Sequence, residues 1–94
     1  MIYRLREHPY ANARIDENPD TNELALISYN TLVVIIDGEG WMEVRGLCSQ
    51  STRRHISWFL RQQRQPGLDY STARMCYMRE LKYNIYTGEV RSAV

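Results

Sequence analysis

Cysteine and histidine are the residues of this chain best suited to chemistry, and each occurs twice. Cys48 and His55 are a candidate nucleophile and base, because a neighbouring imidazole can activate a thiol. They lie seven residues apart across a predicted strand-to-helix connection that does not fix their geometry, so we predict no catalytic pair. His8 is far from His55 in the sequence, and no C-x-x-C or H-x-x-x-H spacing accompanies them. The sequence therefore predicts no metal site.

Other catalytic motifs are also missing. The G-E-G at residues 38–40 has the glycines of a turn but lacks the Gly-Lys-Ser/Thr with which a P-loop holds phosphate. Asp16 and Glu17 are adjacent carboxylates in a polar stretch, where a solvated role is the default. We therefore expect a non-enzymatic protein without catalytic residues, metal or cofactor.

The most informative segment is a predicted helix from Ser51 to Gln65. At about 100° per residue its apolar side chains fall on one side, a face wide enough to cover a sheet. That face consists of Thr52, Ile56, Phe59, Leu60 and Gln63, with His55 beside it. The residues outside it are the predicted partner-binding residues: Arg53, Arg54, Trp58, Arg61 and Arg64.

Two interpretations of these residues stay open. In one, Trp58 packs under the C-terminal segment and the arginines form a solvated face, with their stems lying on apolar surface. In the other, Trp58, Arg54 and Arg61 anchor an interface, because Trp and Arg are the residues most enriched in binding hot spots.

The order of the remaining elements follows from alternation and turn residues. Weak alternation in residues 1–7 and 11–15 predicts one or two short strands, and the polar, Pro-containing stretch 16–22 predicts a loop. Strands are predicted at 24–28, 31–37 and 41–45, with a tight hairpin turn at Asp37-Gly38. These segments form an antiparallel meander.

The segment after Pro66 is ambiguous. Asp69 or Ser71 could cap a second, short helix that runs to about Leu81. The same residues also alternate well enough for a strand, so residues 72–82 fit either structure.

The predicted fold class is α+β, a small antiparallel sheet of three or more strands packed against one main helix, in a single domain spanning residues 1–94. The central run L-V-V-I-I at 32–36 is apolar without alternation, which predicts that both faces of its strand are covered. The helix can cover one face. For the other we expect the N-terminal strands or the C-terminal segment, and a homodimer is the alternative.

Composition narrows the class of protein. The hydrophobic share of 44% and the charged share of 24% are those of a globular chain, and the net charge of +1 gives no global attraction to nucleic acid. No apolar run approaches the roughly 20 residues needed to span a bilayer, and residues 1–8 lack the core of a signal peptide. We therefore expect a cytoplasmic protein with reduced thiols at Cys48 and Cys76.

Three short motifs resemble a pattern in small uncharacterised proteins encoded by phages and other mobile elements. They are S-Y-N-T at 28–31, I-D-G at 36–38 and S-T-R-R-H-I at 51–56. Some small phage-borne proteins inhibit host defence, anti-CRISPR proteins among them. The resemblance implies a protein that acts on a host target.

Three functions are therefore weighed. The leading hypothesis is a phage or mobile-element protein that binds and inhibits a host protein or ribonucleoprotein complex, such as a CRISPR effector, in the host cytosol. The second is a small nucleic-acid-binding module in which the arginines contact phosphates and an aromatic side chain stacks on a base. The third is a structural protein that forms homo-oligomers.

Overall fold

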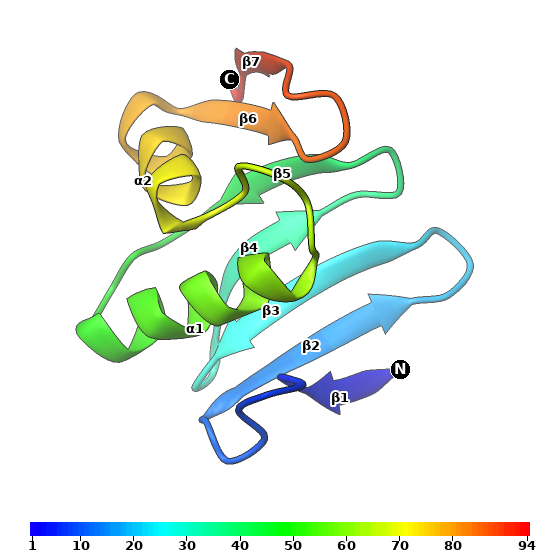
Figure 1. Cartoon of the computed structure of the whole chain (residues 1–94), viewed down its shortest axis with the longest axis vertical. Coiled ribbons are helices and arrows are strands. Elements are labelled where there is room, and N and C mark those ends of the chain that lie inside the picture. The colour runs from blue at the N-terminus through cyan, green and yellow to red at the C-terminus, as the bar shows by residue number, and fades with distance from the viewer.

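One antiparallel sheet forms the first layer of the protein, and two helices form the second (Figure 1). The computed structural model describes residues 1–94. The strands are β1 (Ile2–Arg4), β2 (Ala13–Asn18), β3 (Glu23–Ser28), β4 (Thr31–Ile36), β5 (Trp41–Val44), β6 (Leu81–Asn84) and β7 (Val90–Ser92). The helices are α1 (Gln50–Gln62) and α2 (Tyr70–Arg79). The predicted α+β class, with a meander packed against a main helix and a second short helix, is confirmed.

The meander extends to both ends of the chain, because the seven strands lie in the sheet in sequence order and each pairs antiparallel with the next. β2 is longer than predicted. Asp16, Glu17 and Asn18 were expected in a loop, but they continue the pairing with β3 as far as Asn18 opposite Glu23. The ladder hydrogen bonds to β3 outweigh the poor strand propensity of these residues.

The turn between β4 and β5 is also longer than predicted. It spans four residues, from Asp37 to Gly40, whereas a tight turn at Asp37-Gly38 was predicted. The residue of this turn with a positive φ, 94°, is Gly40. The Asp37 carboxylate explains the difference, because its Oδ1 accepts from the backbone N–H groups of Glu39 and Trp41 at 2.9 and 3.0 Å. A side chain thus closes the loop.

Both helices begin at capped ends, and a cap was predicted for the second of them. Ser49 caps α1 by accepting from the N–H of Thr52, so the helix starts one residue before the predicted Ser51, and it ends at Gln62 rather than Gln65. Asp69 caps α2. The ambiguous segment 72–82 contains both predicted structures, because α2 ends at Arg79 and Glu80 turns the chain with a φ of 54° into β6.

The core lies between the sheet and the helices. α1 packs on β3, and α2 packs on β5 and β6. A β-bulge explains part of the apolar run at 32–36. Leu26 pairs with Val34 while Ile27 pairs with Leu32, so Val33 is an extra residue, and both valines are completely buried.

The other face of the sheet carries no helix, because Figure 1 shows α1 and α2 on the same side. Ile27, Leu32 and Ile35 point to this uncovered face, as they alternate with the buried side chains, and each is only partly buried. The expectation that the chain itself covers both faces of the central strand is wrong. The N-terminal strands and the C-terminal segment extend the sheet at its edges instead.

Candidate functional site

α1 presents one apolar side to the sheet and polar side chains elsewhere, as predicted from its spacing. Ile56, Phe59 and Leu60 are completely buried. Neither α1 nor α2 is long and apolar enough to cross a membrane. The polar side chains of α1 fall into two groups, one buried against β3 and one facing outward.

The buried group is a chain of hydrogen bonds that joins α1 to the end of β3. Ser49 Oγ donates to Thr52 Oγ1 at 3.1 Å, and Ser28 Oγ lies 2.9 Å from Thr52 Oγ1 and 2.8 Å from His55 Nδ1. One direction satisfies every contact, in which Thr52 donates to Ser28 and Ser28 donates to His55. We call these four residues the buried polar chain.

His55 is neutral within this chain at neutral pH. Its side chain is 4% exposed, as expected for a residue beside the core face, and burial lowers its pKa below the ordinary 6.5. A neutral imidazole can accept at Nδ1 while Nε2 carries the proton. The arrangement resembles a serine–histidine pair, but Ser28 is only 1% exposed and cannot reach a substrate. Its role is structural.

Cys48 and His55, weighed above as a candidate nucleophile and base, do not pair. Cys48 is an exposed free thiol, while His55 Nδ1 contacts Ser28. Cys76 is also free, and its burial raises the pKa of the thiol to about 11, which keeps it protonated and unreactive at neutral pH. No three His, Cys, Asp or Glu side chains lie together as metal ligands would.

Trp58 lies against the N-terminal loop that connects β1 and β2. Its ring stacks on His8 with centroids 3.7 Å apart and planes 10° from parallel, and it is partly buried. The His55 ring lies near it as well, with ring centroids 6.0 Å apart and planes tilted by 44°. The interpretation that Trp58 packs under the C-terminal segment is therefore wrong, because the ring packs on the N-terminal loop instead. The tryptophan is held in place by His8, which lies 50 residues away in the sequence, and by His55 on its own helix.

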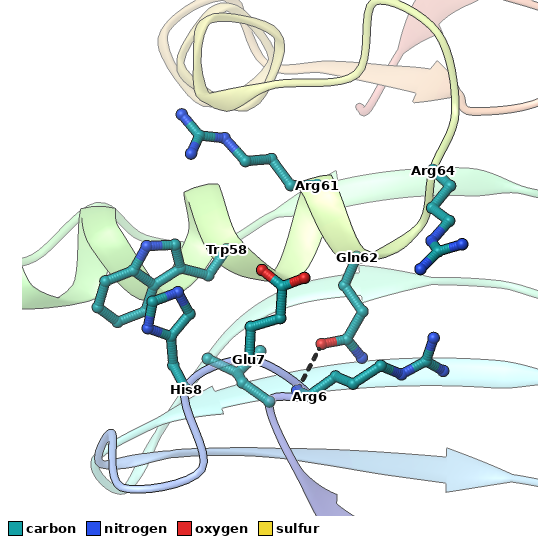
Figure 2. Close-up of a pocket in the computed structure, with 8 residues that line it drawn as sticks. Arg6, Glu7, His8, Trp58, Arg61, Gln62 and Arg64 are labelled. Atoms are coloured by element: carbon teal, nitrogen blue, oxygen red, sulfur yellow. Dashed lines mark hydrogen bonds between the residues drawn. The ribbon is translucent and has the colours of Figure 1, made fainter.

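A pocket of about 150 Å³ opens between this loop and the C-terminal half of α1 (Figure 2). The Arg6 backbone N–H donates to Gln62 Oε1 at 2.9 Å and ties the loop to the helix. The lining residues are Leu5, Arg6, Glu7, His8, Trp58, Arg61, Gln62 and Arg64. We call this cavity the arginine pocket.

The five predicted partner-binding residues divide around the arginine pocket. Trp58, Arg61 and Arg64 line it, whereas Arg53 and Arg54 lie outside it on exposed helix surface. All four arginines are exposed. The protein contains two ion pairs, Met1–Asp16 and Arg45–Glu43, and none of the four takes part in either. Arg53 Nε donates to the Leu47 carbonyl at 3.4 Å, whereas the guanidinium groups of Arg54, Arg61 and Arg64 make no hydrogen bond within the protein and are free to meet an anion from outside.

Sequence reasoning missed the half of the pocket that the N-terminal loop supplies. Arg6, Glu7 and His8 lie in a short run before Pro9 that shows only weak alternation. No local pattern links these residues to α1, which is more than 40 residues away in the chain. The contact depends on the path of the loop around the end of the sheet.

Comparison with known proteins gives one match. A family model described as a family of unknown function (DUF8033) matches residues 1–75. No curated protein and no solved structure matches the chain. The matched range contains every residue of the arginine pocket and of the buried polar chain.

Proposed function

The chain belongs to this DUF8033 family, and we propose that it is a non-enzymatic binding protein that docks an acidic partner through the outer surface of α1. We call that surface, Arg53, Arg54, Trp58, Arg61 and Arg64, the arginine face. The observation that carries the proposal is that its four guanidinium groups have no carboxylate partner within the protein. Arginine and tryptophan are the residues most enriched in binding hot spots.

Rigidity of the central tryptophan supports the same function. Trp58 is stacked on His8 and flanked by His55, so its ring is already fixed before a partner arrives. A preorganised side chain loses less conformational entropy on binding than a free one. The tryptophan can therefore serve as a fixed point around which the arginines contact acidic groups.

The test is capture of a partner from host lysate by immobilised protein. Arg54→Ala/Arg61→Ala should lose the partner, and raising the salt concentration should weaken capture by the wild type, because exposed ionic contacts are screened. Arg74→Ala/Arg79→Ala is the matched control, since it removes two exposed arginines of α2 and the same charge. Equal recovery by Arg54→Ala/Arg61→Ala and wild type would contradict the proposal.

The biological role that we propose is inhibition of a host protein or ribonucleoprotein complex, such as a CRISPR effector, in the host cytosol. What supports it is the resemblance of the three short motifs to proteins of phages and mobile elements. A docked chain would act by masking the surface it covers. Interference by the wild-type protein but not by Arg54→Ala/Arg61→Ala in a plasmid-targeting assay would be the expected result.

A nucleic-acid-binding module is the second candidate, favoured by the same unpaired arginines. One face of Trp58 is already occupied by His8, so base stacking would fall to the exposed Tyr10 or Tyr29. This candidate predicts affinity that falls steeply with salt. Absence of binding to single- and double-stranded probes at ~50 mM salt would exclude it.

The uncovered face of the sheet favours a third candidate, a homo-oligomer. Ile27, Leu32 and Ile35 form an apolar centre there, and Trp41 beside them is covered by Arg91, whose guanidinium lies 4.0 Å from the ring centroid. A second copy placed on this face would bury these side chains. A monomeric mass by light scattering at high concentration would exclude it.

A further inference from the structure

We infer that the arginine pocket binds a phosphate dianion, the terminal group of a phosphomonoester. The inference rests on the proposed function, because it names the chemistry that is recognised at one end of the arginine face. It adds Arg6, Gln62 and the N-terminal loop to the residues that contact the ligand.

The charge of the pocket matches such a ligand. Its lining contains three arginines, Arg6, Arg61 and Arg64, and one acid, Glu7, so the arginines outnumber the acids. Glu7 lies within ion-pair distance of none of the three arginines. Like charges that share a site repel each other unless an anion lies between them. A doubly charged oxyanion supplies that anion, and guanidinium groups bind it with paired N–H donors.

The geometry of Figure 2 fits one anionic group rather than an extended chain. The side chains of Arg6 and Arg64 extend to the same end of the pocket, whereas Arg61 is turned away from it. Gln62 accepts from the Arg6 N–H through Oε1, and its Nε2 makes no hydrogen bond within the protein. Two guanidinium groups and an amide donor are therefore available together. A volume of about 150 Å³ holds one oxyanion with a few waters.

The backbone conformation of Arg64 also supports a phosphate site in this pocket. Arg64 follows the C-cap of α1 with a φ of 56°, the left-handed conformation that glycine adopts most easily. Glu80 takes the same conformation at the end of α2, with a φ of 54°, so the feature that matters at Arg64 is the direction in which it sends the side chain. The conformation carries the Arg64 side chain back beside the helix end and into the pocket.

The test is an NMR titration of the ¹⁵N-labelled protein with inorganic phosphate at constant ionic strength. Phosphate should saturate a single site and shift the backbone amides of residues 5–8 and 62–64 and the Trp58 indole N–H. Acetate is titrated in parallel. If acetate saturates the same site as tightly as phosphate, the ligand is a carboxylate and the inference is wrong.

Two variants separate binding from folding. Arg6→Gln and Arg64→Gly should each raise the phosphate Kd about tenfold, the loss of one hydrogen bond to a charged group. Arg64→Gly should do so while raising the urea midpoint, because glycine relieves the strained φ. Arg74→Gln on α2 removes the same charge outside the pocket and should leave the Kd unchanged. Equal weakening by Arg74→Gln, or shifts scattered over the basic surface without saturation, would overturn the inference.

Two further arms identify the source of the phosphate. Adenosine monophosphate and phosphoserine each carry the same dianion, and both should compete with inorganic phosphate for the pocket. Competition by neither would overturn the inference of a phosphomonoester site. The outcome is also separable from the proposed function, because phosphate binding and partner capture are measured in separate assays. A protein that binds phosphate but captures no acidic partner fails the proposed function alone, and one that captures a partner without binding phosphate fails this inference alone.

Discussion

The buried polar chain and the arginine pocket lie on neighbouring sides of α1, and they differ in where their polar groups find partners. In the buried polar chain, Ser28, Thr52 and His55 bond to one another and to no outside group. In the pocket, the guanidinium groups of Arg61 and Arg64 have no partner. The buried polar chain therefore fixes the position of α1 on the sheet. The arginine pocket is available for contacts with a partner or ligand.

The energies of the two clusters should differ accordingly. A buried donor or acceptor that loses its partner costs about 1–3 kcal/mol. An exposed charge contributes about 0–1 kcal/mol to stability, because water and salt screen it. Loss of a side chain from the buried polar chain should thus act on folding, and loss of a pocket side chain should act on binding unless the substitution also changes the backbone. Each of the following predictions tests that division.

Ser28→Ala should have the largest effect on stability, a loss of about 2–4 kcal/mol. It leaves His55 Nδ1 without a donor, which costs about 1–3 kcal/mol, and it removes one of the two partners of the Thr52 hydroxyl, which still accepts from Ser49. Urea unfolding measures the change. Ser57→Ala on α1 is the control, because Ser57 makes no side-chain hydrogen bond and should change stability by less than about 0.5 kcal/mol. Similar losses in the two variants would show that the buried polar chain does not hold α1 in place.

The stability of the fold should fall as the pH drops below 6.5, and His55 should be one cause. Burial lowers its pKa in the folded protein, so between the folded and unfolded pKa values the unfolded chain binds more protons. The contribution of the neutral ring is complete above pH 6.5 and is lost as the pH falls through the folded pKa. Urea midpoints at about pH 7.5, 6.5 and 5.5 should show this slope. It should be reduced in His55→Gln and retained in His8→Gln, and equal slopes in His55→Gln and wild type would exclude His55 as the cause.

Arg64→Gly and Arg61→Gly should change stability in opposite directions, although the substitutions lie three residues apart. Glycine at 64 relieves a left-handed backbone and should add about 1 kcal/mol. Glycine at 61 lies within α1 and should remove about 1 kcal/mol of helix propensity. Thermal or urea unfolding measures the stability of both variants, and each variant serves as the control for the other. A loss at both positions would mean that contacts of the Arg64 side chain outweigh its strain.

Sequence reasoning recovered the features of α1 that local rules determine. The spacing of Ile56, Phe59 and Leu60 identified the buried side, and Asp69 was one of the two candidate caps for α2, because both features depend on residues within a few positions of each other. The strand order of the middle of the chain followed from alternation and turns. These parts of the fold are fixed by short-range geometry.

The surroundings of Trp58 and His55 could not be predicted in the same way. His8 reaches Trp58 from 50 residues away, and Ser28 reaches His55 from the end of β3. Both contacts depend on how the sheet and the loop place distant segments against α1. The bulge at Val33 has a similar origin, because an extra residue in a strand is defined by its partner strand and leaves no mark in an apolar run. The helical spacing identified Arg61 and Arg64 as candidate binding residues. It did not show that they would line one pocket together with Arg6.

His8→Ala should have a smaller effect on stability than Ser28→Ala and should test where the two clusters meet. The stack with Trp58 is worth about 0.5–1.5 kcal/mol beyond the area it buries, and the loop around it remains tied to Gln62. Trp58 emission, read in a Trp41→Phe background, should shift to longer wavelength as its ring becomes exposed to water. Tyr10→Ala in the same loop is the control, because Tyr10 is 97% exposed and contacts neither cluster. If His8→Ala leaves the emission unchanged while lowering stability as much as Ser28→Ala, the loop belongs with the buried polar chain, and the division between the two clusters is wrong.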